Sequence, residues 1–396
     1  MCVIITNGKN RIAYNIARSL GKRGIMVHSA DFVPFSMTFA SKYSKSHFLY
    51  PSPFRYPREF IECIIQNINR LKAKILIPVF EETFLIAKHK YEILNYTKMV
   101  IPDYDQILTA HNKDRWVPIA NDLKIPVPRN WTINELKKMN NIVHLPFPLL
   151  IKPKQGGGAW AITEIDSGEE LNKVLIQDKY LDFSWERFFV QEKIHGEAHC
   201  VAMLFREGEY RAKVTYKQLR DYPAKGGQAT LRIGIHNEQA EEYFERMLKT
   251  LKWHGICQAD FIVDRKTDIP YLIDINPRFW GSLVQGIASG VDFPYLLYQI
   301  GVEGDVESVK EFKSGVITRW IGGDLIGSIQ YFKQTREKVK FLRDFFLSFK
   351  KSSCYDDFDL KDPLPFFIWG LEIVARVIKQ KTFNPRLADH LEGIWE

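Results

Sequence analysis

The sequence has 396 residues, of which 45% are hydrophobic, and its 55 Lys and Arg against 47 Asp and Glu give a formal charge of +8. This length exceeds what one hydrophobic core usually organises, so we expect two or three domains. The positive charge suits anionic partners such as nucleotides. The basic residues are scattered, however, and no nucleic-acid-binding motif accompanies them, which argues against nucleic acid as a partner.

The cysteines and the apolar segments indicate the cellular compartment in which the protein is expected. The five cysteines lie far apart, with no CxxC pair and no metal-ligand spacing, which favours a reducing environment. The chain enters a strand pattern at residues 3–6 without a signal-peptide core, and no apolar run reaches the roughly 20 residues that cross a bilayer. We therefore expect a cytoplasmic protein with no transmembrane segment.

The first hundred residues alternate short apolar runs with helical stretches. The pattern predicts strands at 3–6, 26–30 and 75–79 and helices at 11–23 and 56–71. Such alternation is typical of an α/β domain with a parallel, doubly wound sheet, whose ligands lie beyond the carboxyl ends of the strands.

That rule brings three groups of residues towards one crevice: Thr6–Asn10, Asp31, and Glu81 with Glu82. A dinucleotide site is set aside, because the first loop holds one glycine, Gly8, where the fingerprint needs three. Two interpretations stay open. Either this edge contacts substrate, or Gly8 makes a tight turn and the two glutamates begin a solvated helix.

A hairpin is predicted around Thr267, after a Pro-rich joint at 125–128 where the chain pattern changes. With the turn centred there, Asp260 lies opposite Asp274 and Ile262 lies opposite Leu272. Because strand side chains alternate, one face carries the residues Asp260, Asp274, Asn276 and Arg278, and the other, apolar face carries Phe261, Val263, Tyr271, Ile273 and Ile275.

Two carboxylates and an amide oxygen held side by side repel one another unless a cation lies between them, and an all-oxygen set suits Mg²⁺. We therefore predict Asp260, Asp274 and Asn276 as metal ligands, with Arg278 facing the same ion. The alternative is a solvated strand face with an incidental ion pair.

A lysine followed by three glycines forms the second candidate. An apolar strand at 148–151 leads to Lys152, and Gly156, Gly157 and Gly158 then allow the backbone to approach an anion closely. A further strand follows at 159–165, so we expect a mobile flap over phosphates, with the next helix capped at Ser167–Glu170. An ordinary flexible loop is the alternative.

A third segment combines an apolar strand, 188–191, with a short linker that contains Glu192, Lys193 and Ile194 and continues to Glu197. Its backbone groups and carboxylates are suited to a flat heterocycle and ribose hydroxyls. In the alternative interpretation, Gly196 and Glu197 form an ordinary turn.

In this order the three segments, over about residues 75–301, resemble the ATP-grasp superfamily, in particular its carbamoyl-phosphate-synthase-like carboxylate-amine ligases. The resemblance implies that Lys113, in His-Asn-Lys-Asp-Arg, and Lys152 hold ATP phosphates. It also implies that Glu192 and the Lys193 and Ile194 backbone contact adenine, with Glu197 on the ribose. The metal signature, acid followed by acid-x-Asn-x-Arg, matches Asp260 and the segment from Asp274 to Arg278.

The continuations at 279–282 and 289–294 are similar to a branch of predicted ATP-grasp carboligases, as is the segment 216–227. In that branch the latter is a loop beside the γ-phosphate, which implies roles for Lys217, Arg220 and Lys225. Asp274 stands where Glu is usual, Trp160 replaces a small residue in the flap, and no biotinyl or lipoyl carrier segment occurs.

The resemblance implies three parts: a pre-ATP-grasp Rossmann-like domain at 1–108, an ATP-grasp domain at 109–302 and a helical extension at 303–396. The grasp domain divides into a small subdomain with the glycine flap, 109–192, and a large subdomain with the metal site, 193–302.

The implied activity is that of a ligase that uses ATP and Mg²⁺, or Mn²⁺ in its place. It activates a small carboxylate as an acyl phosphate and couples it to an amine, releasing ADP and phosphate. Arg278, Lys217, Arg220 and Lys225 would stabilise the transferring charge. No nucleophilic Ser or Cys is expected. The alternatives are a nucleotide-binding regulatory protein without turnover and a small-molecule phosphotransferase.

The apolar stretch 365–378 is predicted to form a helix, with Arg376, Lys379 and Lys381 close by. It packs either on the body of the enzyme or against a second copy in a homodimer. A membrane-surface helix is the other interpretation.

Overall fold

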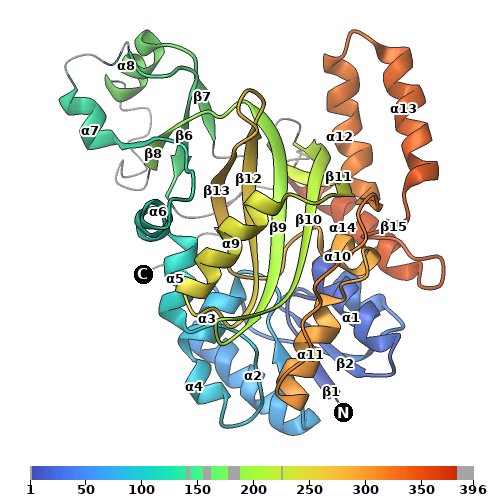
Figure 1. Ribbon diagram of the computed structural model, residues 1–396. Helices are drawn as coiled ribbons and strands as arrows, with labels where there is room; N and C mark the ends of the chain where they lie inside the picture. The colour runs from blue at the N-terminus through green and yellow to red at the C-terminus, as the bar shows by residue number, and fades with distance from the viewer. Residues whose placement is uncertain are drawn as a thin grey trace.

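The computed structural model describes residues 2–139, 142, 144–154, 162–176, 188–223 and 226–380. They form a mixed α/β structure with three sheets and a mainly helical C-terminal region (Figure 1). The glycines at 156–158, Trp160 and Lys225 lie outside the described residues, and with them most of the predicted flap.

The N-terminal part is a four-stranded parallel sheet in the order β3-β2-β1-β4, as the α/β pattern predicted. Its elements are β1 (Cys2–Ile5), α1 (Arg11–Gly21), β2 (Met26–Asp31), the 3₁₀ helix η1 (Met37–Ala40), β3 (Ser44–Leu49), α2 (Pro57–Leu71), β4 (Ile75–Ile77), α3 (Glu82–Lys88) and α4 (Lys90–Ile93). The predicted strands and helices are confirmed, and β3 is additional. It is a largely exposed edge strand whose polar sequence lacks the apolar alternation that reveals a strand.

A second, small antiparallel sheet follows in the order β5-β8-β6-β7. The elements of this region are α5 (Tyr104–His111), α6 (Lys113–Asp122), β5 (Asn130–Thr132), α7 (Ile133–Lys138), β6 (Leu149–Pro153), β7 (Thr163–Ile165), α8 (Gly168–Ile176) and β8 (Phe188–Glu192). The predicted cap of α8 is present, because the Glu170 backbone N–H donates to Ser167 Oγ at 3.2 Å.

The third sheet has seven strands in the order β13-β12-β9-β10-β11-β14-β15. Its elements are β9 (Gly196–Arg206), β10 (Glu209–Tyr222), β11 (Gln228–Gly234), α9 (Glu238–Thr250), β12 (Gly255–Asp264), β13 (Pro270–Asn276), α10 (Leu283–Ala288), α11 (Phe293–Glu303), β14 (Ile317–Arg319) and β15 (Cys354–Tyr355). Helix α9 packs on one face, and α10 and α11 pack on the other.

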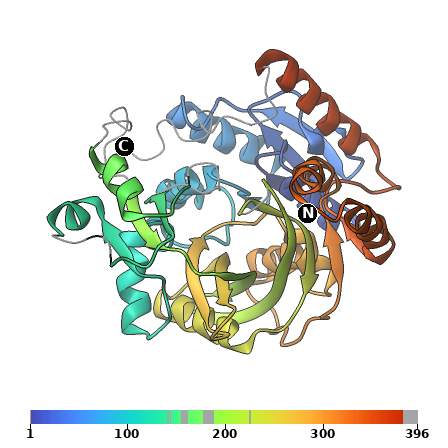
Figure 2. The ribbon, with the colours of Figure 1, turned by 90° about the horizontal axis from the view of Figure 1, so that it is seen from above.

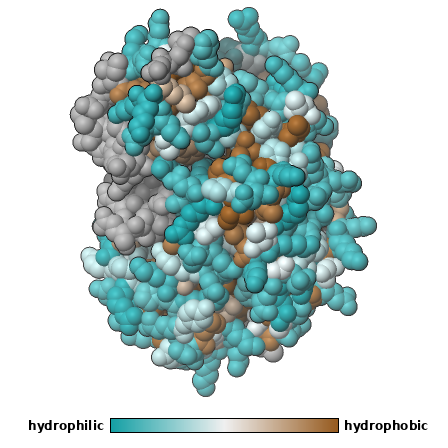
Figure 3. Space-filling view, turned by 60° about the vertical axis from the view of Figure 1, so that its left-hand side comes forward, coloured by the Kyte–Doolittle hydropathy of each residue, from teal (hydrophilic) through white to brown (hydrophobic). Residues whose placement is uncertain are grey.

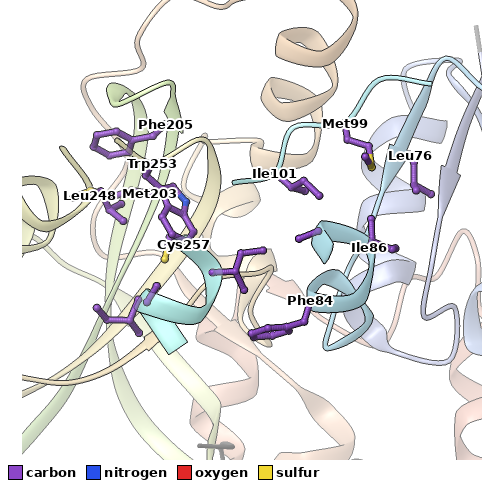
Figure 4. Close-up of a cluster of buried hydrophobic side chains, with 14 of the residues drawn as sticks. Leu76, Phe84, Ile86, Met99, Ile101, Met203, Phe205, Leu248, Trp253 and Cys257 are labelled. Carbon is purple, nitrogen blue, oxygen red and sulfur yellow. The ribbon is translucent and has the colours of Figure 1, made fainter. Parts of the chain in front are cut away.

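The N-terminal and seven-stranded sheets share a hydrophobic core that consists of two clusters. Figure 4 shows Leu76 and Phe84 of the N-terminal part facing Met203 and Trp253 of the seven-stranded part, and all four side chains are buried in a single cluster. This continuous core fixes the N-terminal sheet against the strands that carry the predicted metal ligands.

The region beyond residue 303 is mainly helical, as expected, and it also supplies β14 and β15 to the large sheet. Helices α12 (Ile321–Gln334) and α13 (Lys338–Lys351) stand side by side, and α14 (Leu364–Gln380) runs separately along the N-terminal part (Figures 1 and 2). Helix α14 contacts η1, and Trp369 lies against Gly322, so it packs on the body of the chain. No helix within the described ranges is long and apolar enough to cross a bilayer.

Candidate active site

Strands β12 and β13 pair Asp260 with Asp274, as the hairpin predicted. Past this pair Ile273 forms a bulge, so Phe261 pairs with Leu272 and Ile262 pairs with Tyr271. The predicted pairing of Ile262 with Leu272 was therefore wrong. So was the placement of Tyr271 and Ile273 in the core, because Leu272 is the buried residue while both of these are partly exposed.

Three donors surround the Asp260 carboxylate. Gln258 Nε2 and Cys200 Sγ donate to Oδ1 at 2.7 and 3.0 Å, and Asn276 Nδ2 donates to Oδ2 at 3.2 Å. Burial nevertheless raises the pKa of Asp260 above its usual value, although the Cys200 contact opposes this, and Asp274 raises it further. A cation bound between the two carboxylates would reverse that effect.

Asp274 is held by a lysine from a distant helix. Lys113 is the first residue of α6, and its Nζ donates to Asp274 Oδ1 at 2.7 Å. Burial acts to raise the pKa of Asp274, but the positive charge and hydrogen bond of Lys113 lower it overall. The second carboxylate is therefore charged and already paired with a cation.

Lys152 approaches the same carboxylates from the small sheet. It lies near the end of β6, and its Nζ donates to Gln191 Oε1 at 2.7 Å, while Gln191 Nε2 donates to Asn130 Oδ1 at 2.9 Å. Burial lowers the pKa of Lys152 to about 8, the nearby Lys113 lowers it further, and Asp274 and Asp260 oppose this. Two lysines, one from α6 and one from β6, thus face the two carboxylates of β12 and β13.

Arg278 connects this cluster to the N-terminal part. Its Nε donates to Glu81 Oε1 at 3.0 Å, and its guanidinium lies 4.1 Å from the centre of the Phe80 ring. Its charge acts to lower the pKa of Asp260, and its position towards a bound ion stays a prediction.

The carboxyl edge of the N-terminal sheet is built from the residues predicted to meet there. Thr6 Oγ1 donates to Glu82 Oε1 at 2.5 Å, and the Lys9 backbone N–H donates to Asp31 Oδ2 at 2.6 Å. Burial raises the pKa of Asp31 to about 6, against the effect of Lys9. Glu82 is buried, so the interpretation of a solvated helix start was wrong for this residue.

The linker residues between β8 and β9 lie at the junction of the two subdomains. Arg129 Nε donates to Glu192 Oε2 at 2.9 Å, and the Lys193 backbone N–H donates to Pro148 O at 3.3 Å. The Lys193 side chain pairs with Glu164 of β7, and Ile194 is partly exposed. The resemblance implied adenine contacts here, and these residues stay candidates for them.

Three residues implied by the resemblance lie away from the carboxylate pair. Lys217 Nζ donates to Glu197 Oε2 at 2.6 Å, and the register of β9, β10 and β12 places both on the face opposite Asp260. Arg220 donates from Nε and Nη2 to Asp324 of α12 at 2.8 and 2.7 Å. The structure therefore turns Lys217 and Arg220 away from the carboxylate pair, and Glu197, which the resemblance implied on the ribose, stays a candidate for that contact.

Three uncharged neighbours were missed. Gln258 and Cys200 donate to Asp260, and Gln191 donates to Asn130 and accepts from Lys152. Gln258 was detectable, because it lies two positions before Asp260 and therefore on the same strand face. Cys200 is brought in by the pairing of β9 with β12, which no local pattern reveals.

The surface in Figure 3 is largely hydrophilic in its lower, N-terminal part, and hydrophobic side chains gather at mid-height.

Among the described residues, no group of three or more His, Cys, Asp or Glu has a metal-binding arrangement. A cation on Asp260 and Asp274 would thus depend on the Asn276 amide and on oxygens from outside the chain.

Comparison with known proteins agrees with this geometry. The ATP-grasp domain family matches residues 110–282. The D-alanine–D-alanine ligase of Acetivibrio thermocellus is 24% identical over 42% of the chain and 48% of its own length. The carbamoyl phosphate synthase large chain of Thermoanaerobacter sp. is 21% identical over 57% of the chain and 21% of its own length. The chain thus spans about half the length of that ligase, and 21% of the length of the synthase.

Solved structures share the fold. The N5-carboxyaminoimidazole ribonucleotide synthetase of Thermus thermophilus aligns with a TM-score of 0.58 and 15% identity over 80% of this chain and 81% of that one. The biotin carboxylase of Campylobacter jejuni aligns with a TM-score of 0.65 and 14% identity over 80% and 74%. Residues 110–282 of this chain therefore match the ATP-grasp domain family in sequence, and the chain shares the fold of these solved structures.

Proposed function

We propose that this protein is an ATP-dependent carboxylate-amine ligase. The observation that carries the proposal is the convergence of Lys113 and Lys152 with Asp260, Asp274 and Asn276 between the two subdomains. Two cations and an all-oxygen ligand set are the groups that a metal-bound triphosphate requires. The similarity to a D-alanine–D-alanine ligase supports the same reaction class.

The residues present fit Mg²⁺. Asp260 and Asp274 are adjacent carboxylates, burial disfavours the charged form of Asp260, and its hydrogen-bond partners include the Asn276 amide. Bound there, Mg²⁺ would neutralise charge on the phosphate oxygens. Asp260, Asp274 and Asn276 would hold it.

The chain's own contribution is positioning and electrostatics. Lys113 and Lys152 bind the phosphates, and Arg278 stabilises charge as the bond between the γ-phosphorus and the β-γ bridging oxygen breaks and a carboxylate oxygen bonds to phosphorus. An amine then attacks the acyl carbon, phosphate leaves with the electron pair of the C–O bond, and the amine gives up a proton. The products are an amide, ADP and phosphate.

The test is hydroxylamine trapping. Protein, Mg-ATP and a panel of small carboxylic acids, amino acids included, are incubated with hydroxylamine, and nucleotides and hydroxamates are quantified. The proposal predicts ADP and a hydroxamate in equal amounts with at least one acid. AMP with pyrophosphate would exclude this mechanism, and a stable phosphorylated product would show a phosphotransferase.

A further inference from the structure

Exposed apolar side chains are concentrated in the C-terminal helices. Six of the 21 exposed large hydrophobic residues in the described part of the chain lie on the paired helices α12 and α13, and five more lie between Leu360 and Val374. Scattered exposed apolar residues are ordinary, but a concentration on neighbouring helices marks an interaction surface. None of them takes part in the contacts of the candidate active site.

Helix α13 presents two different faces. Its inner face holds Phe345, which is 8% exposed, and it also carries Phe349, whose ring lies 3.7 Å from the Arg319 guanidinium. Its outer face carries Val339, Leu342 and Phe346, which are 83, 41 and 65% exposed. Residues three and four positions apart share a side of a helix, so these three form a continuous apolar stripe.

Basic side chains border that stripe. Helix α13 has five exposed basic residues and one acidic residue, Asp344. Three of the basic residues lie next to the stripe, Lys338, Arg343 and Lys350, whereas Lys340 and Lys351 lie on the other side of the helix. Lys350 continues the stripe by one more turn beyond Phe346, and Arg343 lies beside it. Long basic side chains around an apolar stripe can extend towards phosphate groups while the stripe enters an apolar layer.

We propose that the outer face of α13 docks onto an anionic lipid surface. The charge decides the occupant: a second copy docking through the same face would set three basic residues against three, whereas an anionic membrane complements them. Contact is peripheral, because no described helix can span a bilayer. Helices α12 and α13 stand out from the sheet, which leaves this face accessible (Figure 1).

Helix α12, which stands beside α13, also carries exposed apolar and basic residues. Leu325 and Ile329 are 46 and 58% exposed and lie one turn apart, and Lys333 continues that side of the helix. These residues add exposed apolar area and one basic charge to the pair of helices.

The full chain is sedimented with vesicles of phosphatidylcholine alone and of phosphatidylcholine with phosphatidylglycerol. We expect binding to the anionic vesicles only, weakened by salt. Leu342→Glu with Phe346→Glu should reduce the partition coefficient by about tenfold or more. The matched control, Leu49→Glu with Tyr96→Glu, alters two exposed apolar residues of the N-terminal part and should bind as the unaltered protein does.

The variants alter only exposed positions, so circular dichroism and the melting temperature should stay unchanged, which separates lost docking from misfolding. The proposal is overturned if the α13 variant binds anionic vesicles as well as the unaltered protein does, or if the unaltered protein binds neither kind of vesicle. A concentration-dependent dimer in light scattering that the α13 variant abolishes would assign the face to a second copy instead. This test is independent of ligase activity.

Discussion

Lys113 and Asp274, 161 positions apart, meet through a 2.7 Å hydrogen bond from Nζ to Oδ1. This contact joins α6 to β13 across the place where we propose the triphosphate binds. Lys113→Met should destabilise the protein by about 1–2 kcal/mol near pH 7, because it leaves a partly buried carboxylate without its closest cation. Urea unfolding measures this, and Lys113→Met with Asp274→Asn should recover most of the loss.

The same pair makes the free energy of unfolding depend on pH. The pKa of Asp274 is lowered overall in the folded protein, because Lys113 outweighs the effect of burial. The stabilisation is therefore fully present above the ordinary carboxyl pKa and is lost as pH falls through the folded value. The difference between the unaltered protein and Lys113→Met should shrink below about pH 4. A difference that grew in acid would contradict the pairing.

Lys152 should take up a proton when nucleotide binds. Its pKa is about 8 in the unliganded protein, chiefly through burial, and a phosphate beside it would raise that value. At pH 8 about half of the side chains are neutral, so binding of Mg-ATP should take up about half a proton, and far less at pH 6.5. Calorimetry in buffers of different ionisation enthalpy measures the uptake. Lys152→Met should abolish it, and uptake that persists would place Lys152 away from the phosphates.

Arg220 should be structural. It is bidentate to Asp324, which is 1% exposed and also accepts from Arg319 Nη1 at 2.7 Å. Arg220→Lys should lower stability by about 2 kcal/mol, because lysine cannot reproduce the bidentate contact. The affinity for Mg-ATP should stay within about twofold, since Arg220 lies away from the carboxylate pair. Arg343→Lys, on the exposed side of α13, is the control for stability. Tenfold weaker nucleotide binding in Arg220→Lys would restore the role that the resemblance implied.

Cys200 should resist alkylation. It is 1% exposed, and burial raises the pKa of its thiol well above the ordinary value, with Asp260 adding to the rise. The thiolate is the reactive form, so iodoacetamide at pH 8 should modify the partly exposed Cys63 and Cys354 and leave Cys200 unmodified. Peptide mass spectrometry reads the result. Rapid labelling of Cys200 would show that the Asp260 side of the sheet is more open than this structure.

Much of the fold follows from local pattern. The alternation of strands and helices predicted β1, β2 and β4, and the strand period placed Asp260 opposite Asp274. The bulge at Ile273 could not be predicted, because it depends on how β13 pairs with β12. The exposed edge strand β3 and the short strand β14 were missed for a related reason: a short or exposed strand has no strong alternation of its own.

The candidate site was predicted where side chains come from one strand or one loop. Asn276 and Asp274 share a strand face, and Lys152 ends a strand, so spacing alone located them. Lys217 and Arg220 were carried over from the resemblance, and their partners Glu197 and Asp324 turn them away. Such a partner is visible only when distant segments are placed together.

The account depends most directly on Asp260 and Asp274 as ligands of a nucleotide-bound cation. Electron paramagnetic resonance of Mn²⁺ titrated with ATP and protein measures this binding. We predict that Asp260→Asn and Asp274→Asn each weaken it by about tenfold or more. Asp268→Asn, a charge-matched control in the exposed turn of the same hairpin, should bind as the unaltered protein does. Unaltered Mn²⁺-ATP affinity in both site variants would contradict the assignment.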